Sequence, residues 1–203
     1  MAANRTEHTA NKYRATIADT YDKQREGKLK WSIENRAVTK FLSNNVPTGN
    51  NVLDCPCGTG RFIKFYSSQR YNVNCVDISE DMLEKAELKR KEHKALNVVL
   101  EKGSILNLWR YTNNYFHTAL AIRIVNLLEP EDMQIALREL QRVSSNYVLF
   151  NIRIGEKGES KWRHPQSIRT VIDAVDSNWF VRDNIRLHED DFRLLVLENK
   201  ERS

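Results

Sequence analysis

The feature that most constrains this fold is the stretch from Val52 to Arg61, which reads VLDCPCGTGR. A short apolar run ends in an acid, passes through a turn with two glycines and enters a segment with helical spacing. A second apolar run, YNVNCVD, ends in Asp77. A strand, a glycine turn, a helix and a second strand that ends in an acid form the unit with which α/β proteins bind nucleotide-shaped ligands.

Segments with strand and helix character alternate along the chain. Extended apolar runs predict strands at residues 51–55, 71–78, 97–102, 118–124, 146–154, 179–187 and 192–197. Helical periodicity predicts helices at residues 11–25, 32–45, 60–68, 79–93, 130–143 and 167–175. Ser79 is a predicted N-cap, and Pro130 a first helical residue. The alternation predicts a parallel sheet covered on both faces, and the four residues between the last two strands predict an antiparallel pair.

The length of 203 residues predicts one domain. Residues 1–10 are polar, and we expect them to be disordered. No apolar run has the length of a membrane span, and the N-terminus lacks the apolar stretch of a signal peptide, so we expect a cytoplasmic protein with no membrane partner. A net charge of +5 and a pI near 9.1 permit an acidic substrate or a nucleic acid without requiring either.

The chain has three cysteines, Cys55, Cys57 and Cys75. An odd number of cysteines at strand ends is not a disulfide framework. The Cys-Pro-Cys run has no second cysteine pair or histidine cluster to complete a metal site. We therefore predict no metal.

The glycine turn does not fit a dinucleotide or a phosphate loop. Ile63 occupies the position where the dinucleotide fingerprint needs glycine or alanine, and no Gly-Lys-Ser/Thr follows. S-adenosylmethionine has no phosphate, and it needs an acid for its ammonium, backbone donors for its carboxylate and an acid for its ribose hydroxyls. Asp54, the turn at residues 58–60 and Asp77 are placed to meet these three needs.

In these residues, and in the runs VDISEDML at 76–83 and LRELQRV at 137–143, the chain resembles the class I S-adenosylmethionine-dependent methyltransferases over residues 12–198. The run IADTYD at 17–22 is similar to the N-terminal helix of the small-molecule branch, which lies over the ligand pocket. The resemblance implies a single domain over residues 1–203, with helices in 11–45 over the cofactor site. It also implies a Rossmann-like sheet of seven strands, mostly parallel, with the last strand antiparallel.

The resemblance implies S-adenosyl-L-methionine as the cofactor and a small or medium-sized acceptor. The cofactor-binding residues that it implies are Tyr21, Asp54, Cys55, Pro56, Gly58, Gly60, Asp77, Ile78, Met82, Gly103, Ser104 and Ile105. Three positions depart from the family pattern. Pro56 replaces a common glycine, Ser104 replaces an acid that faces the adenine, and His117 replaces an aspartate that enters the fourth strand.

Methyl transfer from a sulfonium needs alignment of acceptor and methyl more than it needs a signature residue. A base is required only where the acceptor must lose a proton. The candidate catalytic residues are Arg123 and Asn126, after the fourth strand, and His164 in a charged loop. For each of them a structural role stays open: a salt bridge for Arg123, a turn cap for Asn126 and a solvated surface position for His164.

Two alternative functions stay open at this stage. The basic segment 153–169 and the high pI fit an RNA methyltransferase. Ser104 and His117, in place of the usual acids, fit a non-catalytic S-adenosylmethionine-binding module or a partner subunit. Methylation of DNA bases is disfavoured, because Pro56-Cys57 lies in the cofactor turn and the run after the fourth strand lacks an Asp/Asn-Pro-Pro motif. The sequence favours a small-molecule acceptor over nucleic acid and leaves the oligomeric state open.

Overall fold

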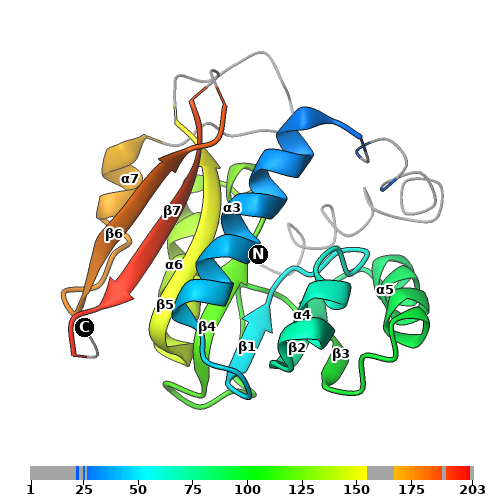
Figure 1. The fold of residues 1–203 in the computed structure, drawn as a ribbon. Coiled ribbons are helices and arrows are strands. Elements are labelled where there is room, and N and C mark those ends of the chain that lie inside the picture. The colour runs from blue at the N-terminus through cyan, green and yellow to red at the C-terminus, as the bar shows by residue number, and fades with distance from the viewer. Residues whose placement is uncertain (1–21, 23–24, 26, 155–166, 189–190, 202–203) are drawn as a thin grey trace.

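The computed structural model describes residues 22, 25, 27–154, 167–188 and 191–201. Figure 1 shows one sheet with helices on both faces. The strands are β1 (Asn51–Asp54), β2 (Asn72–Asp77), β3 (Val98–Lys102), β4 (Phe116–Ala121), β5 (Ser144–Arg153), β6 (Trp179–Arg186) and β7 (Phe192–Asn199). The helices are α3 (Leu29–Asn45), α4 (Ile63–Gln69), α5 (Glu80–Glu92), the 3₁₀ turn η1 (Val125–Leu127), α6 (Pro130–Val143) and α7 (Ile168–Ile172).

The seven strands lie in the order β3-β2-β1-β4-β5-β7-β6. All pairs among the first five strands are parallel, and β7 runs antiparallel to both β5 and β6. This confirms the predicted Rossmann-like sheet and its antiparallel last strand. The strand order reverses between β1 and β4, and open α/β sheets bind their ligands in the crevice beyond such a reversal.

Each face of the sheet carries its own apolar core, because successive side chains of a strand point to opposite faces. Leu53 of β1 packs in the core that contains Leu137 and Leu140 of α6. Its neighbour Val52 packs in the core that contains Phe41 of α3 and Tyr66 of α4. In Figure 1, α3 crosses one face of the sheet, and α6 lies behind it. The two layers hold the carboxyl ends of β1, β2 and β4 in fixed positions.

Most predicted elements are present, and the shifted boundaries have local causes. The helix predicted at residues 60–68 begins at Ile63, because Gly60 has a φ of +73°, which a right-handed helix does not allow. The strand predicted to reach residue 124 ends at Ala121, and η1 follows it. The predicted N-cap is confirmed, since the Ser79 hydroxyl accepts from the Met82 amide, and Pro130 opens α6 as predicted.

Other predictions are not tested by this structure. The helix predicted at 11–25 and the disorder predicted at 1–10 concern segments outside the described residues, apart from Asp22 and Arg25. Within the described part of the chain, no helix combines the length and the apolar character that a membrane crossing requires.

Candidate active site

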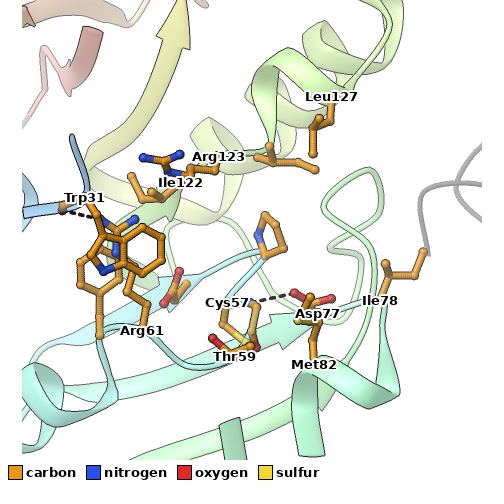
Figure 2. Close-up of a pocket in the computed structure, with 15 residues that line it drawn as sticks. Trp31, Cys57, Thr59, Arg61, Asp77, Ile78, Met82, Ile122, Arg123 and Leu127 are labelled. Atoms are coloured by element: carbon orange, nitrogen blue, oxygen red, sulfur yellow. Dashed lines mark hydrogen bonds between the residues drawn. The ribbon is translucent and has the colours of Figure 1, made fainter. Parts of the chain in front are cut away.

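A pocket opens beyond the carboxyl ends of β1, β2 and β4, where the change in strand order predicts one. Its empty volume is about 700 Å³, open solvent at the mouth included. Its lining residues are Trp31, Asp54, Pro56, Cys57, Gly58, Thr59, Arg61, Phe62, Asp77, Ile78, Met82, Ile122, Arg123, Ile124 and Leu127. Figure 2 shows Asp77, Ile78 and Met82 on one side and Trp31, Arg61 and Arg123 on the other.

Asp77, at the end of β2, forms the acidic side of the pocket. Its Oδ2 accepts from the Gly58 amide at 2.8 Å, and its Oδ1 accepts from the Ser79 amide at 2.9 Å. Burial raises the pKa of Asp77, and these amide hydrogen bonds oppose the rise. Each carboxylate oxygen has two acceptor lone pairs, so Asp77 retains capacity to accept from hydroxyl groups. Ile78 and Met82 add apolar wall beside it.

Asp54, at the end of β1, is a buried carboxyl group that also lines the pocket. Desolvation raises its pKa to about 7, and the hydrogen bond from Tyr66 and the charge of Arg61 oppose this rise. The Tyr66 hydroxyl donates to Asp54 Oδ2 at 3.0 Å. A cation placed beside Asp54 favours its ionised form, so this site is suited to a positively charged ligand.

The turn between β1 and α4 depends on its two glycines for shape. Gly58 and Gly60 have φ values of +56° and +73°. A Cβ atom on Gly60 would lie 2.4 Å from Ile63 Cδ1 and 3.1 Å from the Cα atom of Ala86. Gly60 therefore lets α5 approach the turn closely.

The amides of this turn are largely engaged within the protein. The Gly58 amide donates to Asp77, the Gly60 amide donates to the Cys57 carbonyl at 3.1 Å, and the Cys57 amide donates to the Val76 carbonyl at 2.9 Å. The sequence predicts that the amides at residues 58–60 bind the carboxylate of the cofactor. In the structure, two of those three amides already have acceptors.

The opposite side of the pocket is built around Glu34 of α3, which is fully buried. Its Oε2 accepts from Arg61 Nη1 at 2.5 Å and from Arg123 Nε at 2.8 Å, and its Oε1 accepts from the Asn151 amide group. The Arg61 guanidinium lies 3.6 Å from the centre of the Trp31 ring. This cluster ties α3 to the glycine turn, to β4 and to β5.

Arg123 has the structural role that the sequence left open, and it also lies in the pocket lining. It forms the salt bridge with Glu34, and it lines the pocket with a side chain that is 29% exposed. Its backbone has a φ of +67°, and its amide donates to Asn151 Oδ1 at 2.6 Å. The left-handed backbone and the hydrogen bond to Asn151 fix the position of Arg123 just beyond the end of β4.

The fifteen predicted site residues fall into three groups. Seven predicted residues line the pocket: Asp54, Pro56, Gly58, Asp77, Ile78, Met82 and Arg123. Six others are not among the lining residues: Cys55, Gly60, Gly103, Ser104, Ile105 and Asn126. Tyr21 and His164 lie outside the described residues.

Asn126 and Ser104 have structural contacts of their own. The Asn126 side chain donates to the Arg153 carbonyl at 3.1 Å and accepts from the Arg153 amide at 2.6 Å, which fixes η1 to β5. The Ser104 hydroxyl accepts from the Leu106 amide at 3.2 Å. Asn126 therefore fixes the position of η1, whose Leu127 lines the pocket, although Asn126 itself is not a lining residue.

Sequence reasoning missed eight lining residues: Trp31, Cys57, Thr59, Arg61, Phe62, Ile122, Ile124 and Leu127. Four of them belong to the glycine turn or follow it directly, so their place in the motif was an available signal. Trp31 had no such signal, because its position depends on how α3 packs over the sheet. The described residues contain no group of three or more metal-ligating side chains.

Comparison with known proteins assigns the class of this domain. Residues 52–146 match the family model for a methyltransferase domain. The matched residues are a little less than half of the chain, and with the sheet topology and the acids at the ends of β1 and β2 the match supports a methyltransferase that uses S-adenosyl-L-methionine as its cofactor. A comparison with curated protein sequences finds no match.

Solved structures with the same fold include a magnesium protoporphyrin IX methyltransferase from Synechocystis PCC 6803 with bound S-adenosylmethionine. That chain is 14% identical, with a TM-score of 0.78 over 96% of this chain and 97% of its own. The PH0226 protein from Pyrococcus horikoshii OT3 is 19% identical, with a TM-score of 0.73 over 94% and 99%. A putative rRNA methylase from Clostridium thermocellum is 18% identical, with a TM-score of 0.63 over 80% and 93%.

Proposed function

We propose that this protein methylates a small or medium-sized acceptor that binds between Trp31 and the carboxyl end of β4. The carrying observation is that the pocket lined by Asp54 and Asp77 is also lined by the apolar side chains of Trp31, Ile122, Ile124 and Leu127. Such an apolar, partly enclosed space suits a compact molecule. The similarity to a methyltransferase for magnesium protoporphyrin IX supports an acceptor of this size class.

The residues present fit the cofactor. Asp77 retains acceptor capacity for ribose hydroxyls, Ile78 and Met82 suit the adenine, and Asp54 suits a cationic group. When bound, S-adenosylmethionine supplies an electrophilic methyl group on a sulfonium. The chain itself provides alignment and the exclusion of water, through the apolar side chains around Ile122 and Ile124.

The three candidate catalytic residues take different places in this proposal. Arg123 orients a charged group from the pocket wall, and Asn126 holds η1 against β5 so that Leu127 faces the pocket. His164 remains the candidate base for acceptors that must lose a proton. An acceptor that ionises in solution needs no base from the protein.

Incubation with methyl-labelled cofactor and fractionated cell extract tests this function. We expect label to enter a fraction that passes a filter for small molecules and resists ribonuclease. The matched control is the Asp77→Ala variant, which should transfer no label. Label confined to ribonuclease-sensitive material would overturn the small-acceptor proposal.

RNA methylation is the second candidate, because the pI is near 9.1 and the putative rRNA methylase shares the fold. Most of the basic segment that favours it, residues 155–166, lies outside the described residues. Binding to RNA through phosphate contacts should weaken steeply as salt rises. A titration with unlabelled total RNA at two salt concentrations therefore tests this candidate separately.

A further inference from the structure

On the cationic side of the pocket, two arginines share one buried carboxylate. Glu34 is the buried carboxylate of the cluster, and Arg61 and Arg123 both donate to its Oε2. Two guanidinium groups therefore share one carboxylate at this wall. Because the wall is partly desolvated, the electrostatic interactions of these guanidinium groups are stronger than at an open surface.

Arg123 carries the hydrogen-bond donors that remain open on this wall. Its Nε donates to Glu34 at 2.8 Å, whereas its two Nη atoms have no hydrogen-bond acceptor among the residues that the structure describes. The rings of Trp31 and Phe192 each lie 5.5 Å from its guanidinium carbon. The hydrogen bond to Glu34 holds the guanidinium group at its Nε atom, and the two aromatic rings pack against it. The two Nη groups form the end-on fork that binds a carboxylate with two parallel hydrogen bonds.

The alternative donors for a carboxylate in this pocket are few. The amides of Gly58 and Gly60 already donate to Asp77 and to Cys57. The Thr59 hydroxyl donates to Asp22 Oδ1 at 2.8 Å. Among the three turn amides, that of Thr59 has no acceptor in the described part of the chain. A neutral amide is a weaker donor to an anion than a guanidinium, so the strongest open donors near the turn are on Arg123.

We propose that Arg123, held by Glu34 together with Arg61, is a carboxylate receptor inside the pocket. This inference rests on the proposed function. The carboxylate has two possible sources in a methyltransferase: the methionine part of the cofactor, or an acid group on the acceptor. Both place the same chemical group against the same two donors, and binding measurements separate them.

The first arm of the test compares two cofactors that differ only in the carboxylate. Calorimetric titrations of wild type, Arg123→Gln and Arg123→Lys use S-adenosylmethionine and its decarboxylated analogue. If the cofactor is the source, Arg123→Gln weakens S-adenosylmethionine binding about 10- to 100-fold and leaves binding of the analogue unchanged. Arg123→Lys keeps the charge but loses the fork, so it should fall between wild type and Arg123→Gln.

The second arm tests the acceptor as the source. Protein saturated with S-adenosylhomocysteine is mixed with phenylacetate or with phenylacetamide, and binding is followed by ligand-observed NMR. If the acceptor is the source, phenylacetate binds the wild type in preference to the amide, and Arg123→Gln removes this preference. In that case, the variants and the wild type should bind S-adenosylmethionine with equal affinity in the first arm of the test.

Control measurements keep the outcomes distinct. Arg110→Gln removes an arginine that pairs with Glu101 away from the pocket lining, and it should behave as wild type in both arms. Thermal melting of each variant shows whether it is folded. If Arg123→Gln does not fold, Arg123→Lys takes its place in both arms of the test. If wild type binds the cofactors but no Arg123 variant alters either arm, the receptor proposal is wrong while the proposed function stands. If wild type binds no cofactor, both proposals fall.

Discussion

The two sides of the pocket are built in different ways. The acidic side uses Asp54, Gly58 and Asp77, which lie at the ends of two neighbouring strands and in the turn between them. The cationic side joins Glu34 and Asn151, which are 117 residues apart in the sequence, and adds Arg61 and Arg123. The first side is a local motif with a fixed spacing. The second is a product of tertiary packing, and it exists only when α3 lies against the sheet.

The largest expected effect comes from removing the acid at the centre of the cationic side. Glu34→Gln leaves Arg61 and Arg123 without their buried counter-charge. We expect the free energy of unfolding to fall by about 3 kcal/mol, which corresponds to a melting temperature lower by about 6–12 °C for a chain of this size.

Calorimetry or circular dichroism melts measure this effect. The matched control is Glu80→Gln, because Glu80 forms an exposed pair with Lys102, and its side chain is 72% exposed. An exposed pair contributes little, so this control should melt within about 2 °C of wild type. Equal melting temperatures for the two variants would show that Glu34 does not hold the cationic side together.

The acidic side should respond in binding more than in stability. Asp77→Ala removes the acceptor of the Gly58 and Ser79 amides, and with it the acid that we propose for the ribose hydroxyls of the cofactor. We expect the affinity for S-adenosylhomocysteine to fall about 30- to 150-fold, the equivalent of about 2–3 kcal/mol. Titration calorimetry measures it, with Glu131→Ala on exposed α6 surface as the control. An unchanged affinity would remove Asp77 from the cofactor site.

The contrast between the two sides explains what the sequence predicts. Asp54 and Asp77 end apolar runs, and parallel strands bring such ends to one edge, so their proximity follows from the pattern. Neither the burial of Glu34 nor its contact with Arg123 follows from any local pattern, because a charged residue on a helix is normally exposed. The engagement of the Gly58 and Gly60 amides also depends on turn geometry that the letters GTG do not specify.

The two glycines of the turn offer a finer test of the acidic side. A Cβ on Gly60 would meet Ile63 and Ala86, whereas a Cβ on Gly58 would meet nothing within 4 Å. Both have a positive φ, so each alanine variant pays for backbone strain of about 1 kcal/mol. Gly60→Ala should cost about 1–3 kcal/mol more through overpacking. Chemical denaturation measures both, and equal losses would mean that the approach of α5 does not depend on Gly60.

The smallest effect expected on binding is a pH dependence that belongs to Asp54. Its pKa is raised to about 7 from 3.8 by desolvation. Between these values the native state holds a proton that the unfolded chain has released, so this group makes the protein less stable as pH rises from about 4 to 7. The affinity for a cationic cofactor changes with pH in the opposite direction, because a cation binds better to the ionised carboxylate. Affinity should therefore rise about tenfold between pH 6 and pH 8.

Two variants separate Asp54 from Asp77, whose pKa is raised in the same direction. Asp54→Asn removes the Asp54 contribution and flattens the binding profile near pH 7. Tyr66→Phe removes the hydrogen bond that lowers the Asp54 pKa, so it should move the midpoint to higher pH. Titrations of S-adenosylmethionine at several pH values measure both. A midpoint that Tyr66→Phe leaves in place would assign the titration to Asp77, and would make β2 rather than β1 the pH-sensitive part of the acidic side.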